Sequence, residues 1–323
     1  MTTVAALAML PPPLSDLASG TRIGASTVRQ SWATLARLDQ LEATHGGGAV
    51  YELTTSIAKR LIDALGSASY STATGRELRG VASASAVKAG WRAYDAGRSE
   101  EARRWWLETL RLHELGPGAE EARHRALAAM SKDASDQGNG RDGIALAQAA
   151  AKVGANLGSP AMMSFAAARE AIGHASVGDQ ANSIRALRRA RLLMDREAAY
   201  DRPEWLIFWG PSDIASHEMR CGRLLESPRT SQEAARTAAK LVTDDTSPRN
   251  RAIYDVYLAY ELARAGNLDE AIALGTGILR HTALHGSGRI RNELKSTATS
   301  LARHDYQPAK DFALTAHRIL FAS

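Results

Sequence analysis

The stretch AVKAGWRAYDAGRSEEARRWWLETLRL, residues 86–112, restricts the possible fold more than any other part of the chain. Gly90 and Ala102 are small residues at an interval that lets two antiparallel helices approach closely, and Gly97 between them supplies the turn. Trp106 then fills the gap to the next pair of helices. Because one such helical hairpin cannot bury its apolar face alone, the stretch predicts neighbouring hairpins of the same kind.

Further helical hairpins are predicted along the chain at similar spacing. In the last clear one, Ala259, Gly266 and Ala271 reproduce the intervals seen in residues 86–112. The predicted hairpins cover residues 26–65, 77–110, 122–154 with a turn at Gly140, 160–195 with a turn at Gly178, and 249–281 with a turn at Gly266.

Turn and capping residues predict where the remaining elements begin and end. Ser26 is predicted to cap the first helix, and the glycines at 46–48 are predicted to end it. A second helix covers about 51–65, and the Ser-, Thr- and Gly-rich residues 66–75 are expected to form a loop. The later elements are an aromatic insertion bounded by proline at 200–210, helices at 212–225 and 231–242, and a degenerate pair at 288–302 and 308–321 that caps the array.

The domain organisation follows from the internal repeat. Residues 1–25, with three consecutive prolines at 11–13, are predicted to be a flexible arm or the remnant of a linker. A chain of 323 residues suggests two globular domains by its length, but the repeat favours one long array. We therefore predict one all-α domain over 26–323, in which hairpins similar to tetratricopeptide repeats stack as a right-handed superhelix, an α-solenoid.

Composition narrows the class of protein. Hydrophobic residues at 45% suffice for a continuous core. The single cysteine, Cys221, excludes an intramolecular disulfide, is expected in the core and fits a reducing cytosol. There is no basic leader, and no apolar run approaches the roughly 20 residues that span a bilayer, so we expect a cytoplasmic protein without membrane contact. The net charge of +5 is compatible with phosphate or acidic partners but establishes no site.

Several segments together carry a resemblance to a known family. They are LDQLEATHGGGAVYEL, AGWRAYDAGRSEEARRWW, AAAREAIGHASVGD, PEWLIFW and RAIYDVYLAYELARAGNLDEA. Over about residues 22–281 the chain resembles the C-terminal tetratricopeptide-repeat region of actinobacterial XRE-type helix-turn-helix transcriptional regulators. The resemblance implies a regulatory role in transcription. Too few residues precede the array for a DNA-binding domain, so we expect either a fragment of a longer regulator or a stand-alone relative that keeps the sensing or scaffolding half.

Candidate binding residues are those on the first helices, which line the concave face of such arrays, and those of the aromatic insertion that is expected to border it. Arg169 lies in the small, apolar run SFAAAREAIG, where an arginine needs water, an anion, or a partner such as Glu170 or Asp213. Three tyrosines recur at spacing three and suit a wet groove. The predicted binding residues are Lys88, Trp91, Tyr94, Arg169, Trp209, Asp213, Tyr254, Tyr257 and Tyr260.

Structural explanations compete with these binding roles. Trp105 and Trp106 belong to a second helix and are expected to pack in the core. The tyrosines also suit half-buried packing, and Lys88 suits a solvated surface. The arginine-rich residues 185–191 favour a solvated convex face over a phosphate-binding strip.

No catalytic motif is present in the sequence: there is no phosphate loop, dinucleotide fingerprint, G-x-S-x-G elbow or paired carboxylates. The sequence HEMRC at 217–221 is similar to a zinc-protease helix, but no third zinc ligand follows at a usual spacing. We therefore predict a non-catalytic protein without cofactor or metal that binds a peptide, protein segment or small molecule in its concave groove. A separate DNA-binding protein and a second copy of the chain are its other candidate partners. The alternatives are an enzyme of specialised metabolism, with Arg169, Asp213 and His217 in the groove, and a non-specific nucleic-acid binder that uses its basic helices.

Overall fold

The computed structural model describes residues 22–45, 47–112, 118–196, 202–243, 246–281 and 287–321. In these ranges the regular structure consists of fourteen α-helices and one short 3-10 helix, without a β-strand. Arg22 and Ser69 form an isolated parallel bridge. The prediction of an all-α fold is confirmed.

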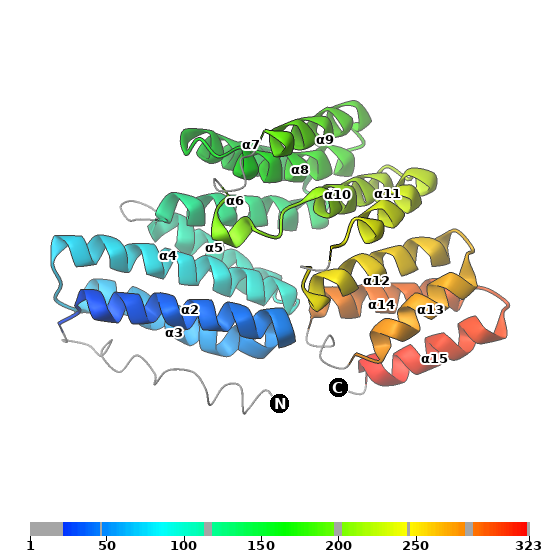
Figure 1. Cartoon of the computed structure of the whole chain (residues 1–323), viewed down its shortest axis with the longest axis horizontal. Coiled ribbons are helices and arrows are strands. Elements are labelled where there is room, and N and C mark those ends of the chain that lie inside the picture. Colours follow the sequence, from blue (N-terminus) through cyan, green and yellow to red (C-terminus); the bar gives the residue numbers. More distant parts are fainter. Residues whose placement is uncertain are drawn as a thin grey trace. The chain divides into compact units, whose positions relative to one another are not determined.

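Two compact units divide the chain, Met1–Met130 and Ser131–Ser323. The first contains α2 (Ala25–His45), α3 (Gly47–Ser67), α4 (Thr72–Asp95), α5 (Ser99–Leu112) and most of α6 (Ala119–Asp136). The second contains the end of α6, then α7 (Gly140–Asn156), α8 (Pro160–Ser176), α9 (Gln180–Asp195), η3 (Glu204–Leu206), α10 (Pro211–Leu224), α11 (Pro228–Lys240), α12 (Pro248–Arg264), α13 (Leu268–Leu279), α14 (Gly288–Leu301) and α15 (Gln307–Phe321). Within each unit, successive helices pack on one another (Figure 1). Since the division falls inside 26–323, the single domain predicted there stays a prediction.

Glycines in the left-handed conformation form the predicted turns of three helix pairs. Gly97, Gly178 and Gly266 have φ of 81°, 78° and 80°, so these turns are confirmed. The turn predicted at Gly140 is wrong, because the left-handed residue is Gly138, with φ 80°. Gly140 instead begins α7, where an added Cβ would lie 2.0 Å from the hydroxyl oxygen of Ser176. Close helix packing, and not a turn, therefore explains this glycine.

Three predicted boundaries near the start of the chain are wrong. Helix α2 begins at Ala25, before Ser26, and α3 already begins at Gly47, inside the glycine run. Helix α4 begins at Thr72, with Ser71 as its N-cap, whose hydroxyl accepts a hydrogen bond from the Thr74 N–H. The expected loop is thus shorter, because the preference of Ser, Thr and Gly for loops is weak and tertiary packing overrides it.

The close approach of α4 and α5 at Gly90 is confirmed. An added Cβ at Gly90 would lie 2.4 Å from the indole Nε1 of Trp106 and 3.1 Å from the carbonyl oxygen of Ala102. Trp106 is completely buried and belongs to an apolar cluster with Ala122 and Ala126 of α6. It therefore packs against its own helix pair as well as against the next helix, the role predicted for it.

Gly90→Ala tests this packing. We expect it to lower the free energy of unfolding by about 1–3 kcal/mol, because a methyl group overpacks the contact with the Trp106 ring. Gly66→Ala in α3 is the matched control: no atom lies within 4 Å of the added Cβ there. The control should be neutral or stabilising by roughly 0.5–1 kcal/mol, as Ala is the better helix former. Equal effects in urea denaturation would show that α4 and α5 do not meet at Gly90.

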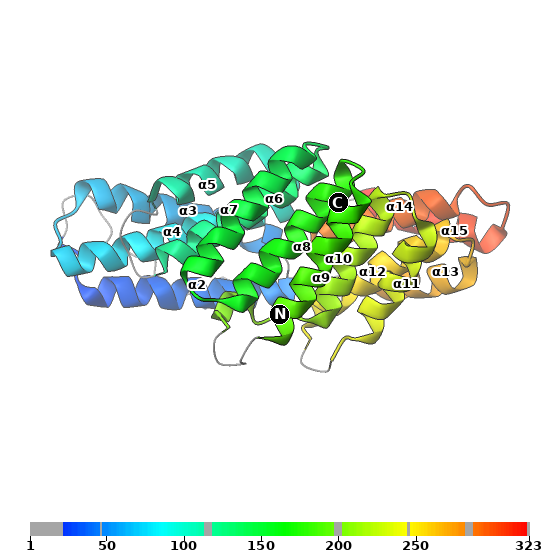
Figure 2. The same cartoon turned by 90° about the horizontal axis from the view of Figure 1, so that it is seen from above.

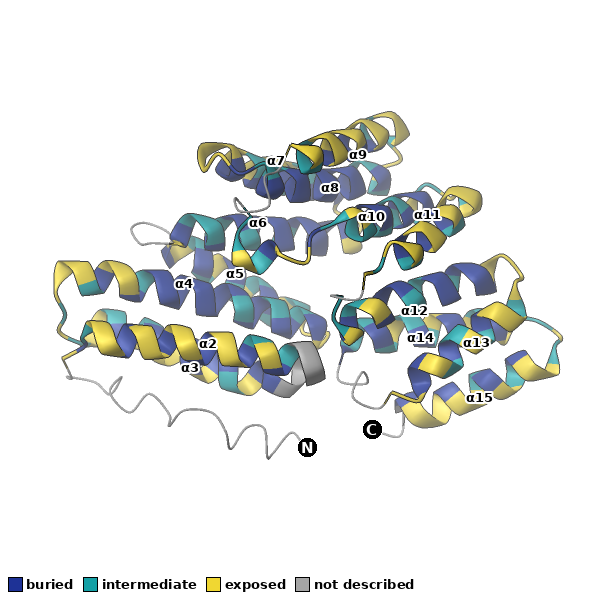
Figure 3. Cartoon of the chain, viewed as in Figure 1, coloured by how far each residue is buried: buried dark blue, intermediate teal, exposed yellow. Residues whose placement is uncertain are grey.

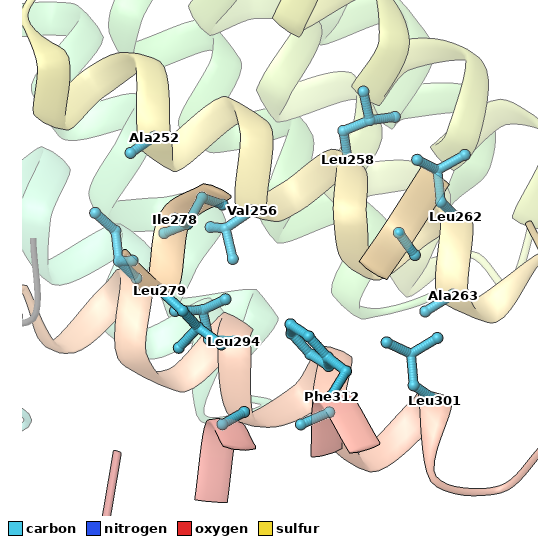
Figure 4. Packing of buried hydrophobic residues seen from close by; sticks show 14 of the residues in the cluster. Ala252, Val256, Leu258, Leu262, Ala263, Ile278, Leu279, Leu294, Leu301 and Phe312 are labelled. Atoms are coloured by element: carbon cyan, nitrogen blue, oxygen red, sulfur yellow. The ribbon is translucent and has the colours of Figure 1, made fainter. Parts of the chain in front are cut away.

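The largest apolar cluster lies at the end of the second unit. Residues of α12, α13, α14 and α15 meet there, and the ring of Phe312 lies among the side chains of the other helices (Figure 4). An added Cβ at Gly275 of α13 would lie 2.6 Å from Phe312 Cζ, so this glycine makes room for the ring. The final helices, predicted to be a degenerate capping pair, thus share a core with α12 and α13.

Candidate functional site

Buried charge is confined to one helix of each pair in the part of the chain that the structure describes. Helix α8 is buried along most of its length, whereas its neighbour α9 exposes much of its surface (Figure 3). The buried charged and histidine side chains all lie on α4, α6, α8, α10 and α12, which we call the buried-charge helices. They are Arg92, Asp95, His124, Lys132, Asp133, Arg169, Glu170, His217, Arg249 and Glu261. The buried residues of α5, α9, α11 and α13 are instead small or apolar, with Ser and Thr as their most polar members.

In the first unit this buried charge forms an ion network around Arg92. The completely buried Arg92 donates hydrogen bonds to Asp39 at 2.8 Å, to Glu42 at 2.9 Å and to Thr54. Lys88 also binds Asp39, and burial followed by the charge of Arg125 lowers its pKa. The Lys88 side chain is 13% exposed and already has a partner within the chain, and its binding role stays a prediction.

Trp91 and Tyr94 form an aromatic pair on α4. Their rings are stacked with centroids 5.7 Å apart, and the Tyr94 ring lies 6.0 Å from that of Trp106. Both side chains are half-buried against the apolar cluster of Trp106. The pair contributes to packing, and its binding role stays a prediction.

In the second unit, the predicted binding residue Trp209 is part of the core. Its side chain is completely buried, and its Nε1 donates a 3.0 Å hydrogen bond to the hydroxyl of Ser164. Edge-to-face contacts join the Trp209 ring to Phe165 at 5.0 Å and to His217 at 5.2 Å. The prediction that Trp209 contacts a ligand is corrected, because no surface of it is left to do so. Sequence alone does not show which of two adjacent aromatics in the insertion turns inward.

A cluster of basic side chains lies on three buried-charge helices of the second unit and on α14. We call Lys132 of α6, Arg169 of α8, Arg220 of α10 and Arg289 of α14 the basic cluster. Burial lowers the pKa of Lys132 well below its usual value, and the charges of the three arginines lower it further. Within the cluster, Asp136 accepts a 2.6 Å hydrogen bond from Lys132 and forms an ion pair with Arg220. Lys132 and Arg169 of the cluster are buried, whereas Arg220 and Arg289 are partly exposed.

Arg169 is held over an aromatic ring. Its guanidinium carbon lies 4.8 Å from the centre of the Phe165 ring, and its side chain is buried. Of the two carboxylates suggested from the sequence, Asp213 feels the charge of Arg169, which lowers its pKa. Glu170 instead binds Arg189, and one of its oxygens lies 3.6 Å from Nε2 of His174.

Asp213 and Tyr254 join α10 to α12. The two side chains share a hydrogen bond, and Asp213 also accepts one from the Gly210 N–H at 3.2 Å. Burial raises the pKa of Asp213 to about 6, even though Tyr254, Gly210, Arg169 and Arg289 all favour the carboxylate. Burial, with the charge of Asp213, also raises the pKa of Tyr254. A partly buried acid with a pKa raised towards neutral pH is typical of functional sites.

His217 lies among the cations one helical turn after Asp213. Its Nδ1 is 2.7 Å from the carbonyl oxygen of Asp213, so Nδ1 carries the proton and donates. Its Nε2 is buried and has no hydrogen-bond partner among the described residues. Burial lowers the pKa of His217 well below 6.5, and the charges of Arg169, Lys132 and Arg289 add to this effect. The ring is thus neutral near pH 7.

The other two tyrosines of α12 have different neighbours. Tyr257 is half-buried against the large apolar cluster. The guanidinium carbon of Arg223 lies 4.4 Å from the Tyr260 ring centre, and Arg223 itself binds Glu261 at 2.7 Å and Glu293 at 2.9 Å. Lys88, Trp91 and Tyr94 belong to the first unit and the other predicted binding residues to the second, so one common groove stays a prediction.

The remaining sequence candidates have structural roles. Cys221 is buried in the core, as predicted. Across the described ranges, no group of three His, Cys, Asp or Glu residues could hold a metal ion, and no helix is long and apolar enough to cross a membrane. The basic helix α9 is exposed at Arg189 and Arg191, which bind Glu170 and Glu218.

Lys132, Arg220 and Arg289 were missed by the sequence reasoning. The sequence contains little indication of these three residues, because each cation lies tens of residues from the others. Helix packing alone brings them together. Lys132 offers the best clue, since AAMSKDAS places it within a run of small residues, as SFAAAREAIG does for Arg169.

The burial of His217 predicts a pH dependence of stability. The unfolded chain binds a proton with a pKa near 6.5, whereas the folded chain does not, so stability is lost as the pH falls below about 6.5. The loss grows as the pH falls from 6.5 towards 5, because the unfolded chain takes up more of this proton than the folded chain does. Asp213 acts in the opposite direction, because its raised folded pKa makes the folded state gain stability as the pH falls through 6.

A comparison with His217→Gln separates these two contributions, because both proteins keep Asp213. Urea denaturation at pH 6.5 and pH 5 should show a smaller loss of stability in His217→Gln than in wild type. Identical losses in the two proteins would mean that His217 is accessible to protons in the folded state.

No protein-family model matches the chain, and no curated protein matches it.

Proposed function

We propose that the chain is a non-catalytic binding protein whose helix pairs stack as a tetratricopeptide-like right-handed superhelix. Its buried-charge helices face the concave side and bind a peptide, a protein segment or a small molecule there. In a cytoplasmic transcriptional regulator it serves as the sensing or scaffolding part and acts through a DNA-binding protein or domain.

One observation carries this proposal: the described buried charges lie on one helix of each pair. Burying charge costs free energy, and apolar replacements of buried ion pairs are often at least as stable. The partner helices bury small and apolar side chains, so helix packing itself does not require charge. Charge on one helix of each pair is expected if those helices form a shared binding surface. In the second unit, the buried-charge helices α8 and α10 are in contact, and α12 contacts α14, the helix of Arg289 (Figure 2).

A ligand screen tests the proposal. The full chain is screened against peptide and metabolite libraries by thermal shift, and each hit is titrated into wild type, Arg169→Ala and Tyr257→Ala. We expect a ligand whose affinity falls at least about tenfold in Arg169→Ala, as for a true anchor residue. Arg236→Gln is the control, because Arg236 lies on α11, is exposed and binds Glu270. If the ligands bind wild type, Arg169→Ala and Tyr257→Ala with the same affinity, the proposed binding surface is wrong.

An enzyme is the second candidate, and the raised pKa of Asp213 favours it. Asp213 would then act as a general acid near neutral pH, with Tyr254 fixing its orientation. Incubation of each hit with the protein, followed by mass spectrometry, separates the candidates. Chemical conversion of the hit that is lost in Asp213→Asn would establish the enzyme, whereas an unchanged hit supports binding alone.

A further inference from the structure

We infer that the basic cluster of the second unit, together with His217, is a binding site for an oxyanion, that is, a phosphate or carboxylate group of the ligand. This inference rests on the proposed binding function and names the chemical class of the ligand. The site consists of Lys132, Arg169 and Arg289 as cations, with Nε2 of His217 as the group that completes the hydrogen bonding.

The charges of the cluster are the first argument. Lys132 and Arg169 are only 8% and 7% exposed, so water screens their mutual repulsion poorly. Three carboxylates already act on these cations: Asp136 is shared between Lys132 and Arg220, Asp133 raises the pKa of Lys132, and Asp213 interacts with Arg169 and Arg289. An oxyanion beside Lys132, Arg169 and Arg289 would offset the repulsion that now acts on Lys132. Arg289 lies in the first turn of α14, where the helix dipole adds positive potential.

The second argument is the hydrogen bonding of His217. Its side chain is 8% exposed, and Nδ1 donates to the Asp213 carbonyl, which leaves Nε2 as the group without a partner. A buried polar atom without a hydrogen bond costs free energy. When Nε2 takes up a proton it becomes a donor, and a phosphate or carboxylate oxygen is the matching acceptor.

The third argument is preorganisation around Arg169. Phe165 holds its guanidinium group at 4.8 Å, and the Phe165 ring is itself held edge-to-face by Trp209 at 5.0 Å. Trp209 is anchored through Ser164, whose hydroxyl donates a 2.7 Å hydrogen bond to the Ala190 carbonyl. An arginine supported in this way loses little side-chain entropy when it binds an anion.

Proton uptake should accompany oxyanion binding. The groups that act on His217 are Arg169 of α8, Lys132 of α6, Arg289 of α14 and, on its own helix, Asp213, which is bonded to Tyr254 of α12. Burial and, after it, the three cations keep the ring neutral, and a bound anion counteracts the cations. The pKa of His217 therefore rises on binding, and a proton is taken from solvent.

Isothermal titration calorimetry of the full chain with inorganic phosphate and with succinate tests the inference. Chloride keeps the ionic strength constant, so that general screening does not contribute. We expect at least one probe to bind with a Kd on the order of 1 mM or tighter. The heat should depend on the ionisation enthalpy of the buffer, which reports proton uptake. Binding of phosphate alone assigns a phosphate group, and binding of succinate alone assigns a carboxylate.

Three variants locate the site. Lys132→Met removes one cation at similar volume, and its removal relieves repulsion, so the variant should fold. It should weaken probe binding about tenfold or more, and Arg169→Met should do the same. His217→Gln should abolish the buffer dependence of the heat. Arg236→Gln removes an exposed arginine from another helix and should leave binding and buffer dependence unchanged.

Two results overturn the inference. The first is that neither probe binds, and the second is that Lys132→Met and Arg236→Gln bind a probe equally well. Both results leave the proposed function intact if the library screen finds a neutral ligand that responds to Arg169→Ala. Conversely, if a probe binds at the cluster and a hit is turned over enzymatically, the oxyanion site is supported and the non-catalytic binding function is wrong.

Discussion

Arg92→Met should lower the free energy of unfolding by about 3–5 kcal/mol. Arg92 is completely buried and donates to Asp39, Glu42 and Thr54. Methionine fills a similar volume, so the expected loss comes mainly from Glu42, which is 16% exposed, and the buried Thr54, which both lose a charged donor, while Asp39 is 42% exposed and keeps Lys88. Breaking a buried ion pair from one side costs more than the pair contributes, because the remaining charge is poorly hydrated. Urea denaturation monitored by circular dichroism measures the change.

Arg104→Met on α5 is the matched control. Arg104 lies in the same unit, its side chain is 77% exposed, and its carboxylate partner Glu100 is 3.8 Å away. Exposed ion pairs contribute about 0–1 kcal/mol, so this variant should stay within that range of wild type. If the two variants have the same stability, the network around Arg92 is not buried as described.

Phe312→Ala should destabilise the second unit by about 3–5 kcal/mol. Phe312 of α15 is 5% exposed and fills the space beside Gly275, where α12, α13, α14 and α15 meet. Truncation removes the apolar surface of the ring and leaves a cavity that four packed helices cannot fully close. The melting temperature and the urea midpoint should both fall.

Leu314→Ala provides the control on the same helix. Leu314 is 58% exposed, so its truncation should change stability by less than about 0.5 kcal/mol. If Phe312→Ala is as mild as Leu314→Ala, α15 does not pack on the core of the second unit.

Much of the helical architecture could be predicted from local sequence. Gly97, Gly178 and Gly266 were identified as turns because each follows an apolar helical segment and precedes another. The close contact at Gly90 was also predictable, since a glycine, an alanine and a tryptophan at these intervals satisfy one packing geometry. Such features depend on residues near each other in the chain.

The wrong boundaries have causes beyond the propensity of single residues. Gly140 looks like a turn in sequence, but its missing side chain makes room for Ser176 of α8, more than thirty positions away. The Ser-, Thr- and Gly-rich residues before Glu77 look like a loop, but Gly75 packs against the Tyr70 ring, with an added Cβ only 2.7 Å from it. Local propensity cannot report contacts of either kind.

The candidate site was predictable at Arg169 and Asp213 but not as a cluster. An arginine in a small, apolar helical run indicates a buried charge, whereas its neighbours depend on how five helices pack. Trp209 shows the opposite error: an aromatic residue in an irregular insertion suggested a ligand contact, and the structure buries it completely. The meeting of α6, α8, α10 and α14 at one site is a property of tertiary packing.

Native mass spectrometry of the protein purified from its own cells tests most directly whether the second unit binds an anionic ligand, because it measures the mass of any molecule that stays bound. We predict that wild type and Arg236→Gln carry an anionic molecule of the same mass, and that Lys132→Met and Arg169→Met purified in parallel have lost it. Retention of the same molecule by all four proteins would contradict a binding surface built on the buried-charge helices.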